Sequence, residues 1–418
     1  MVPELLSIRT GWVTLIAIYN GPFRFSDHSD ILNLGSFGKY AEIMKKTIIV
    51  FLPFLALALS GCSIGQQQAA STQDVPTVPG GLLSQNEKGS IWKSEDGGQT
   101  FKVKSTVDQA RSIDTAEILS ITFHPTKPKT IILGTVSNGV FKTDNGGDTW
   151  NPIPFPPKRI YSFILDRRNP DNRMFVSGVV NTRGKIFRTD DAGANWTEVY
   201  TEPGSNTFIS SLAQDLWNPD IIYAGTTAGV ILKSLDAGAT WKDMGSKSEY
   251  GIVTDIVFDA KIHDSVSFLS FQNKMYHSSD GGNTWIDWSK VKQDQKSANP
   301  PSVDPGQILS LVADPSRSGV LYAGTSSSGV FRSQDDGKDW TKLNIIESAE
   351  KFPIRSIAVD PKNSDHIVFV AGKGFYRSLD SGATWSVTAL NSDRSASVVA
   401  YDPFDSQFLF IGIRNATK

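Results

Sequence analysis

Cysteine is almost absent from this chain of 418 residues, and its one copy, Cys62, excludes an internal disulfide. Neither sign of charge is in excess: 41 Lys and Arg stand against 43 Asp and Glu, so the net charge of −2 gives no electrostatic support for a nucleic-acid partner. The five histidines are scattered, with no pair at metal-ligand spacing, and there is no glycine-rich phosphate loop or Ser/His/Asp pattern. We therefore expect no cofactor, no metal site and no nucleic-acid binding.

Long apolar runs are also missing. The clearest one, from Thr47 to Leu59, has 13 uncharged residues, whereas a membrane-spanning helix needs about 20. It follows the basic start Met44-Lys45-Lys46 and leads to Leu59-Ser60-Gly61-Cys62, a pattern that resembles the signal peptide and lipobox of bacterial lipoproteins. The sequence thus predicts a lipoprotein signal peptide over residues 44–61 and lipidation of Cys62. Such a protein is anchored in the cell envelope, on the outer face of a membrane. A buried thiol or a chance match is the open alternative.

The segments on either side of the signal peptide have different characters. Residues 1–43 show no sustained period, and we interpret them as an extension upstream of the true start at Met44, with a short cytoplasmic extension as the alternative. Residues 62–88 are rich in Gln, Ala, Ser, Thr, Pro and Gly, the composition of a flexible tether that cannot bury a core. The folded body is expected over residues 89–414.

An eight-residue motif recurs seven times in this body. Its pattern is Ser/Thr-x-Asp-x-Gly-x-Thr-Trp, as in residues 278–285, and its closing aromatics are 49, 46, 45, 44, 55 and 45 residues apart. A fixed period of this size signals a propeller or a solenoid. The fifth-position glycine can adopt positive φ, and the Asp carboxylate can accept hydrogen bonds from the amides of a tight turn.

We expect structural roles for the Asp or Asn and the closing Trp of these motifs, because the Trp supplies an apolar face that packs on neighbouring strands. These residues are Asp96, Asn145, Asp191, Asp236, Asp280, Asp335 and Asp380, and Trp150, Trp196, Trp241, Trp285, Trp340 and Trp385. A calcium loop is the rival interpretation of residues 144–148, but the downstream Glu of an EF-hand is missing.

The motif resembles the Asp-box, or BNR repeat, of bacterial sialidases, sortilin-type receptors, xyloglucan hydrolases and the photosystem II stability/assembly factor family. The resemblance covers about residues 89–414 and is specific for fold rather than for function. It implies that the boxes sit at the rim of a propeller, away from any active site. The overall pattern is most similar to photosystem II assembly factor-like proteins, whose members in phototrophs bind assembling membrane complexes.

The ends of the body predict how the fold closes. Each full repeat has four short apolar segments, as in residues 308–343, but the body begins with the last two segments of a repeat and ends with the first two, over residues 398–412. Pairing these halves closes a ring and removes open sheet edges. A linear solenoid would have no use for complementary half-repeats. The sequence therefore predicts an all-β fold: a single seven-bladed β-propeller, closed by pairing the N-terminal and C-terminal half-blades.

Loops on the face opposite the boxes are the expected binding loops. The longest, residues 286–307, contains Trp288; it is predicted to be a lid or docking loop, with an insertion of no role as the alternative. This loop and the starts of the inner strands supply the candidate ligand-binding residues Glu117, Arg159, Tyr161, Asp255, Trp288, Gln307 and Arg355. A ring of serines is expected deeper in the channel, as ordinary polar lining: Ser120, Ser162, Ser211, Ser310 and Ser356.

Two function hypotheses follow. The first is a tethered, monomeric, non-enzymatic scaffold that binds a protein or a cell-envelope glycan. The second is a glycan-binding or glycan-hydrolysing protein, with Glu117 and Asp255 as candidate carboxyl groups. Sialidases of similar repeat type have six blades and an Arg-Ile-Pro motif, where this sequence has Arg159-Ile160-Tyr161, and xyloglucan hydrolases use a cleft between two propellers. On these grounds we favour the scaffold and expect no catalytic residues.

Overall fold

The computed structural model describes residues 6–10, 13–17, 87–155, 157, 159–245, 250–271, 274–288, 305–345 and 352–415. The chain forms two compact units, Met1–Gly80 and Gly81–Lys418. In the first unit, β1 (Leu6–Thr10) and β2 (Val13–Ala17) pair as an antiparallel hairpin. The predicted signal peptide and Cys62 lie outside the described residues. Within the ranges given above, no helix has the length and apolar character that a membrane crossing requires.

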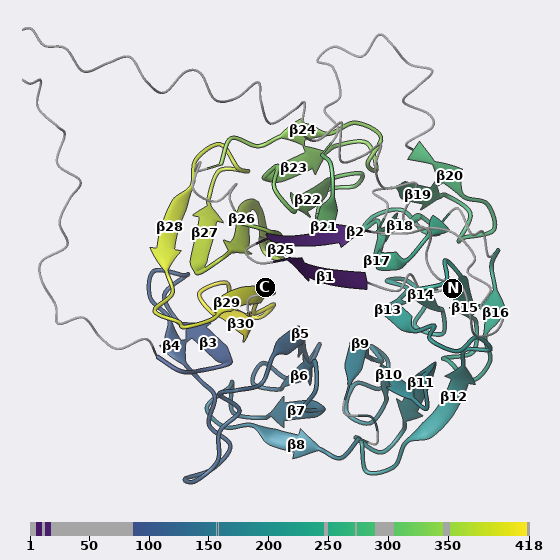
Figure 1. Cartoon of the computed structure of the whole chain (residues 1–418), viewed down its shortest axis with the longest axis horizontal. Coiled ribbons are helices and arrows are strands. Elements are labelled where there is room, and N and C mark those ends of the chain that lie inside the picture. Colours follow the sequence, from purple (N-terminus) through teal and green to yellow (C-terminus); the bar gives the residue numbers. More distant parts are fainter. Residues whose placement is uncertain are drawn as a thin grey trace, which may run out of the picture. The chain divides into compact units, whose positions relative to one another are not determined.

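The second unit is a ring of seven four-stranded antiparallel sheets around a central axis (Figure 1). Blades 1 to 6 each use four consecutive strands, from the innermost to the outermost. Blade 1 consists of β5 (Ile118–Phe123), β6 (Ile131–Thr135), β7 (Val140–Thr143) and β8 (Asn151–Ile153). Blade 2 consists of β9 (Ile160–Leu165), β10 (Met174–Val180), β11 (Arg183–Thr189) and β12 (Thr197–Thr201). Blade 3 consists of β13 (Ile209–Gln214), β14 (Ile222–Thr226), β15 (Ile231–Ser234) and β16 (Lys242–Asp243).

Blades 4 to 6 follow the same order. Blade 4 consists of β17 (Val253–Phe258), β18 (Val266–Ser270), β19 (Met275–Ser278) and β20 (Ile286–Asp287). Blade 5 consists of β21 (Ile308–Ala313), β22 (Leu321–Thr325), β23 (Val330–Ser333) and β24 (Thr341–Lys342). Blade 6 consists of β25 (Ile354–Asp360), β26 (Asn363–Ala371), β27 (Gly374–Ser378) and β28 (Ser386–Ala389). The second strand of a blade is buried on both faces, as in β6 and β22, because each sheet packs between two neighbours.

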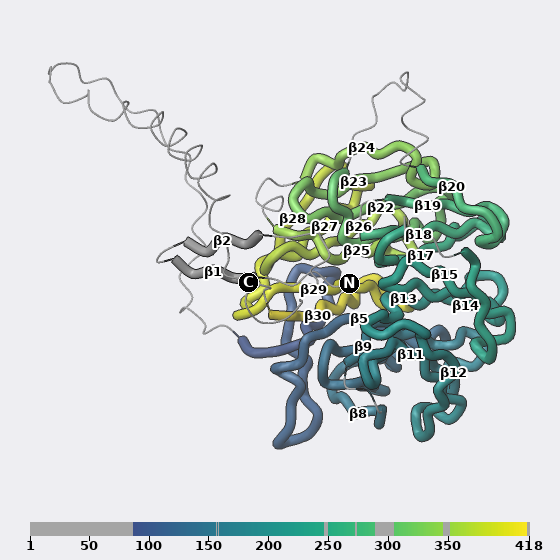
Figure 2. Tube along the Cα trace, turned by 45° about the vertical axis from the view of Figure 1, so that its right-hand side comes forward, coloured from purple at the N-terminus to yellow at the C-terminus, as the bar shows by residue number. Residues whose placement is uncertain are grey.

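Blade 7 is assembled from both ends of the propeller unit. Its sheet runs from β29 (Ser395–Tyr401) and β30 (Leu409–Arg414) to β3 (Ile91–Ser94) and β4 (Lys102–Val103), and the halves pair with Ile91 opposite Gly412. Figures 1 and 2 show these distant segments side by side. The prediction of a seven-bladed, all-β propeller closed by half-blades is therefore confirmed.

The core lies between adjacent blades. At the junction of blades 5 and 6, for example, the buried side chains of Tyr322 and Val330 pack with Ile354, Ile367 and Phe369. Similar clusters of β-branched and aromatic side chains fill the other junctions. Burial of this apolar area, at about 25 cal/mol per Å², holds the blades around the axis.

The inner strands of blades 1 to 6 share a bulge after their first residue, and in blades 2 and 6 the side chain that follows it joins neighbouring blades. Ser162 Oγ accepts the N–H of Leu212 at 2.9 Å, and Ser356 Oγ accepts the N–H of Val399 at 3.1 Å. Asp255 occupies the same register position in blade 4, where the other five blades counted in the sequence have serine. The prediction that Asp255 lies with the strand starts, above the serines, is therefore wrong: Asp255 lies at the level of the serines, one bulge further along the strand.

Each Asp-box is held by its own side chains. In blade 4, Asp280 Oδ1 accepts the Oγ–H of Ser278 at 2.7 Å and the N–H of Thr284 at 2.8 Å, and Oδ2 accepts the Oγ1–H of Thr284 at 2.6 Å. Gly282, at φ 83°, provides the left-handed turn and donates its N–H to Ser278 Oγ. Trp285 then packs edge-on against Phe268, with the ring centroids 4.8 Å apart.

In several blades a cation just before the box reaches the next blade. Lys233 Nζ donates to the carbonyl oxygen of Gly281 at 2.7 Å, and Arg188 donates to that of Ala237 at 3.1 Å; both acceptors are the fourth residue of the following box. In blade 4 this position is His277, which is buried. The ring of His277 stacks on Trp288, 5.4 Å away, so the junction of blades 4 and 5 is built differently from the others named here.

Candidate functional site

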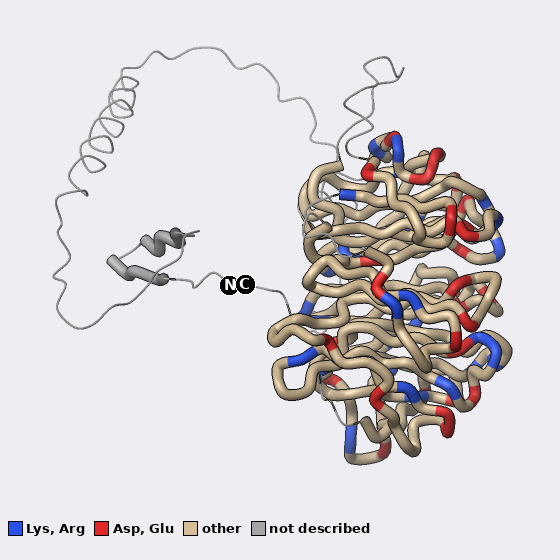
Figure 3. Tube along the Cα trace, turned by 90° about the vertical axis from the view of Figure 1, so that its right-hand side faces the viewer, with Lys and Arg blue, Asp and Glu red and all other residues tan. Residues whose placement is uncertain are grey.

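The strand order gives the propeller two unlike faces. The turns between first and second strands and the Asp-box turns lie on one, which we call the box face. The loops between second and third strands and the connections between blades lie on the other, which we call the loop face. Seen from the side, Lys, Arg, Asp and Glu gather mainly toward the box face, opposite the C-terminal end of β30 (Figure 3). The described part of the loop face is therefore better suited to a neutral ligand than to a highly charged one.

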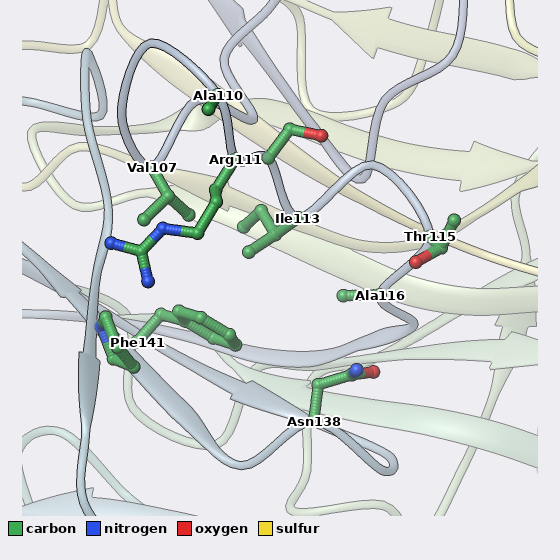
Figure 4. Close-up of a pocket in the computed structure, with 10 residues that line it drawn as sticks. Val107, Ala110, Arg111, Ile113, Thr115, Ala116, Asn138 and Phe141 are labelled. Atoms are coloured by element: carbon green, nitrogen blue, oxygen red, sulfur yellow. The ribbon is translucent and has the colours of Figure 1, made fainter.

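A pocket of about 410 Å³ opens on the loop face at blade 1, between the connection from blade 7 and the β6–β7 turn. We call it the blade-1 pocket. Ile113 and Phe141 form an apolar floor, and Arg111, Thr115 and Asn138 place polar groups around it (Figure 4). Volumes of 300–1,000 Å³ are typical of small-ligand sites, and an apolar floor with a few polar groups suits a ligand that carries hydroxyls.

The walls of the blade-1 pocket are anchored to the rest of the fold. Asp108 accepts the Nε–H of Arg111 at 2.6 Å, and this hydrogen bond lowers the pKa of the Asp108 carboxyl. Arg394, from the connection before blade 7, donates to the carbonyl oxygens of Ala116 at 3.1 Å and Gly89 at 2.9 Å. Arg394 thus fixes the backbone at Ala116, one of the residues that line the pocket.

A buried carboxyl group lies at a second place on the loop face, between blades 2 and 3. The side chain of Glu202 is 3% exposed and accepts the hydroxyl groups of Tyr200 and Thr207, both at 3.3 Å. Burial raises the pKa of Glu202, and the negative charge of the exposed Asp243, on β16, acts in the same direction. Its proton is therefore held more firmly than that of an exposed Glu. We call Tyr200, Glu202, Thr207 and Asp243 the blade 2–3 carboxyl cluster.

The backbone around this cluster is unusual. Asn181, Thr182 and Asn206 have φ values of 49°, 65° and 60°, in the left-handed region that non-glycine residues rarely adopt. Asn206 donates its N–H to the carbonyl oxygen of Thr182 at 2.7 Å, which ties the β10–β11 turn to the connection between the blades. Asn181 and Thr182 are the two central residues of the hairpin turn between the paired Val180 and Arg183, a turn type that requires positive φ at both.

The indole N–H groups of the box tryptophans differ in their partners, and those of Trp241, beside the cluster, and Trp285 have none among the described residues. Trp150 and Trp196 donate their Nε1–H groups to the carbonyl oxygens of Lys104 and Pro154, both at 2.7 Å. The buried Nε1 of Trp241, whose ring lies 6.3 Å from that of Tyr200, has no hydrogen-bond partner among the described residues. A ligand hydroxyl is a chemically suitable acceptor for this donor.

The structure brings two of the sequence-predicted candidates together at the channel mouth. The guanidinium of Arg159 lies 5.6 Å from the ring of Tyr161, and Tyr161 stacks on Phe208 with the centroids 5.4 Å apart. Phe208 follows Thr207 of the carboxyl cluster, so these groups occupy one sector of the loop face. Phe208, Glu202 and Asp243 were not among the sequence-predicted candidates, because contact between two blade connections leaves no local motif.

The other candidates are placed apart from this sector. Glu117 accepts the N–H of Asn415 at 2.9 Å and so fastens the end of β30 to blade 1. The carbonyl oxygen of Gln307 accepts the N–H of Ser326 at 2.9 Å. Burial lowers the pKa of Arg355, and the positive charge of Arg414 lowers it further.

Asp255 and Trp288 have contacts inside the fold. The Asp255 carboxylate accepts the N–H of Leu311 at 3.4 Å, and burial raises its pKa to about 7. Trp288 is 7% exposed and lies between blades 4 and 5, not on a docking surface. The rest of its loop, residues 289–304, lies outside the described residues. Within the described ranges, no group of three or more His, Cys, Asp or Glu is arranged to hold a metal ion.

Two family models match the chain. The one described as the DUF6242 beta propeller domain matches residues 168–407, and the one described as sortilin (neurotensin receptor 3) matches residues 89–199.

The curated relatives include xyloglucanases. One from Hypocrea jecorina (strain QM6a) is 24% identical over 226 residues, or 46% of this chain and 27% of the relative. Xyloglucanase Xgh74A of Acetivibrio thermocellus is 27% identical over 292 residues, or 60% of this chain and 31% of the relative. The chain therefore spans about a third or less of the length of these relatives.

Solved structures share the fold at low identity. The GH74 xyloglucanase from Xanthomonas campestris has a TM-score of 0.59 at 16% identity, over 71% of this chain and 51% of that one. YCF48 from Cyanidioschyzon merolae has a TM-score of 0.51 at 17% identity, over 71% of this chain and 95% of that one. The predicted resemblance to sortilin-like propellers and to YCF48, a photosystem II assembly factor, is confirmed at the level of fold.

The prediction of a non-enzymatic scaffold is contradicted by these comparisons. The curated relatives are glycoside hydrolases, and GH74 enzymes are among the structural neighbours. The alternative of a glycan-acting protein agrees better with them. The sequence-based argument against an enzyme was the lack of a second propeller, whereas the similarity to two of the xyloglucanases extends over 60% and 67% of this chain.

Proposed function

We propose that this chain, which belongs to the DUF6242 beta propeller domain family, acts as a glycoside hydrolase on a neutral, xyloglucan-like polysaccharide. The observation that carries the proposal is the sequence similarity to xyloglucanases, which extends over 60% of the chain in one of them. An enzyme of this kind needs a surface for a neutral chain of sugars and two carboxyl groups for the chemistry.

The loop face supports the first requirement. Its low charge suits a neutral polysaccharide, and the blade-1 pocket offers Phe141 as an apolar floor with Arg111 and Asn138 as hydrogen-bond donors. The stacked rings of Tyr161, from blade 2, and Phe208, at the start of blade 3, add aromatic surface on the two blades that follow. Aromatic rings of this kind pack against the C–H faces of sugars, while polar side chains orient their hydroxyls.

The blade 2–3 carboxyl cluster supports the second requirement. In glycoside hydrolysis one carboxyl group donates a proton to the leaving oxygen, and a second, ionised one activates water or attacks the sugar carbon. We assign the proton donor to Glu202, whose burial raises its pKa, and the second role to the exposed Asp243. Environments that separate the proton affinities of two nearby carboxyl groups are the usual basis of such a division of roles.

The proposal is tested by assaying the full chain and its variants for new reducing ends on xyloglucan and other neutral β-glucans. Glu202→Gln and Asp243→Asn are each expected to lower kcat by about 100-fold or more, the usual effect of losing a general acid or base. Glu198→Gln is the matched control, because Glu198 lies on the same strand, β12, and pairs with Lys185. Absence of hydrolysis by the parent protein on every neutral glucan would refute the function, and full activity in both variants would refute the residue assignment.

We also propose that residues 44–61 are removed and that Cys62 carries the lipid anchor of a cell-envelope protein. The basic start, the 13-residue apolar run and the single cysteine support this. Mass spectrometry of the mature N-terminal peptide is expected to show an acylated cysteine, and Cys62→Ser is expected to move the protein from the membrane fraction to the soluble fraction. An unmodified Cys62 in a chain that retains residues 44–61 would contradict the anchor.

A further inference from the structure

Trp217 is an exposed aromatic residue on the box face, opposite the face that carries the groups assigned above. It lies in the turn between β13 and β14 and is 44% exposed. Its ring stacks on the imidazole of His263, from the equivalent turn of blade 4, with the centroids 4.0 Å apart and the planes at 23°. The imidazole supports the indole from the neighbouring blade, and a large part of the indole surface remains open to solvent.

Both turns are fixed by hydrogen bonds before any ligand arrives. Asp215 Oδ1 accepts the N–H groups of Trp217 at 2.7 Å and Asn218 at 2.8 Å. Asp259 Oδ1 accepts the N–H of Ile262 at 2.8 Å, next to His263. A rigid aromatic ring loses little conformational entropy on binding, which is an advantage for weak stacking contacts.

The pair departs from the repeat pattern at its position. Trp217 is the second residue after the Asp that caps the turn. In the other six blades the same position holds Thr126, Arg168, Lys261, Ser316, Lys362 and Phe404. Leu216 and Ile262, beside the stacked pair, are also exposed, at 39% and 49%. The adjoining turns of blades 3 and 4 thus present a small apolar cluster around the stacked pair; among the other blades only blade 7, with Phe404, has an aromatic residue at the Trp217 position.

The surroundings of Trp217 favour a neutral, polar ligand of narrow cross-section. Arg168 forms an ion pair with Asp220 of the same turn, so the local charges are compensated. Asn218 and Lys261 are exposed beside the stack and can donate hydrogen bonds. The patch comprises a few side chains, whereas a stable protein interface takes about 20–30 residues on each side, so it matches a sugar ring better than a protein partner.

We propose that Trp217, supported by His263, is a second glycan-binding site, which holds a pyranose ring of the neutral polysaccharide on the face opposite the assigned carboxyl groups. The identity of this ligand rests on the proposed function, but the site does not take part in bond cleavage. The C–H face of the sugar packs on the open indole face, and the hydroxyls at its edge reach Asn218 and Lys261. Such a site raises the local concentration of polysaccharide around the enzyme.

The experiment measures retention of the full chain in affinity gels that contain xyloglucan, together with hydrolysis of short xyloglucan oligosaccharides that are too small to reach both faces. Trp217→Ala is expected to weaken retention by about tenfold, the worth of one aromatic stacking contact, and to leave oligosaccharide hydrolysis unchanged. Trp217→Phe is expected to keep part of the retention. His263→Ala is expected to weaken it less than Trp217→Ala, because it removes only the support. Leu235→Ala is the matched control and is expected to bind as the parent does, because Leu235 is an exposed apolar residue of the same blade that lies in its box turn, outside the stacked pair.

The two proposals fail in different ways. Parent-like retention of Trp217→Ala, or no retention of the parent protein, would overturn the second site. Retention that depends on Trp217 in a protein without hydrolytic activity would overturn the proposed function and support the site. A change of oligomeric state in Trp217→Ala, measured by sedimentation, would identify the patch as a contact between copies and would also overturn the site.

Discussion

The indole N–H of Trp288 donates to the backbone oxygen of Asp336 at 3.0 Å and so joins blade 4 to the box turn of blade 5. In neighbouring junctions a cation binds the corresponding carbonyl oxygen, as Lys233 does with Gly281. Trp288 also lies under the ammonium group of Lys338, 4.6 Å from its ring centroid. Trp288, at the start of the longest loop, thus supplies the contact between blades 4 and 5 at this carbonyl oxygen. His277 occupies the position of the cation but does not bind that oxygen among the described contacts.

Replacing Trp288 is expected to affect stability first. Trp288→Ala removes a buried ring and leaves a cavity between blades 4 and 5, so we expect a loss of about 3–5 kcal/mol in the free energy of unfolding. Trp288→Phe keeps most of the packing and loses the hydrogen bond to Asp336, and its loss is expected to be smaller. Chemical denaturation measures both. An unchanged midpoint in Trp288→Ala would show that the ring does not hold the junction.

The carboxyl group of Asp255 is expected to make stability depend on pH. Burial raises its pKa to about 7 in the folded protein, while the unfolded chain has the ordinary value of about 3.9. The folded state therefore holds the extra proton between these values, and ionisation of this group disfavours folding progressively as the pH rises from about 4 to about 7. Asp255→Asn cannot ionise, so its stability relative to the parent is expected to increase over that range and then level off.

Thermal unfolding of both proteins between pH 4 and pH 8 checks this expectation. Asp255→Ser, which restores the residue of the other inner strands, serves as the control for loss of charge with a shorter side chain. A constant difference between Asp255→Asn and the parent across that range would contradict the argument.

The box aspartates are expected to titrate in the opposite sense. Hydrogen bonds from Thr284 and Ser278 lower the pKa of Asp280 to about 2, so its stabilising effect is present above about pH 4 and is lost as the pH falls toward 2. Asp280→Ala removes the hydrogen bonds at all pH values and is expected to lose about 1 kcal/mol at neutral pH.

Asp280→Asn is the matched control, because blade 1 naturally carries Asn145. That residue accepts the N–H of Thr149 at 3.0 Å and donates its Nδ2–H to Thr149 Oγ1 at 2.9 Å. Asp280→Asn is therefore expected to be close to the parent at neutral pH and less sensitive to acid. Equal stability of the Ala and Asn variants would show that the side-chain bonds of the box contribute little.

Arg394 is expected to be important for closing the ring. Its side chain is 12% exposed and donates to the carbonyl oxygens of Ala116 and Gly89 and to Ser90 Oγ at 3.0 Å. Arg394→Ala removes all of these charged hydrogen bonds from the closure of the ring, and we expect a loss of about 3 kcal/mol. Arg394→Lys keeps the charge without the planar fork that spans several acceptors, so an intermediate loss is expected.

Limited proteolysis is a direct measure of this effect, because an open ring exposes the connection from blade 7 to blade 1. Faster cleavage between residues 104 and 117 is expected in Arg394→Ala. A cleavage pattern identical to that of the parent would show that β-pairing alone closes the ring.

The fold was accessible from the sequence because its signals are local and repeated. The box residues around Asp280 and Trp285 recur at a nearly constant period, and the half-repeats at the two ends indicate how the ring closes. The candidate site was accessible only in part. Tyr161 was found because it begins an inner strand, whereas Glu202 was missed, since its partners Tyr200 and Thr207 gain importance only when the connection folds over it.

The amino-acid order alone determined the number of blades, the box turns and the pairing of the first and last strands, because each depends on spacing along the chain and on turn chemistry. Tertiary structure decided which side chains meet across blade junctions: Asp255 among the serines, Trp288 beneath Lys338, and Trp217 against His263. Those contacts join residues about 40 to 60 positions apart, and their burial and proton affinities depend on the packing of two neighbouring sheets, which no single repeat contains.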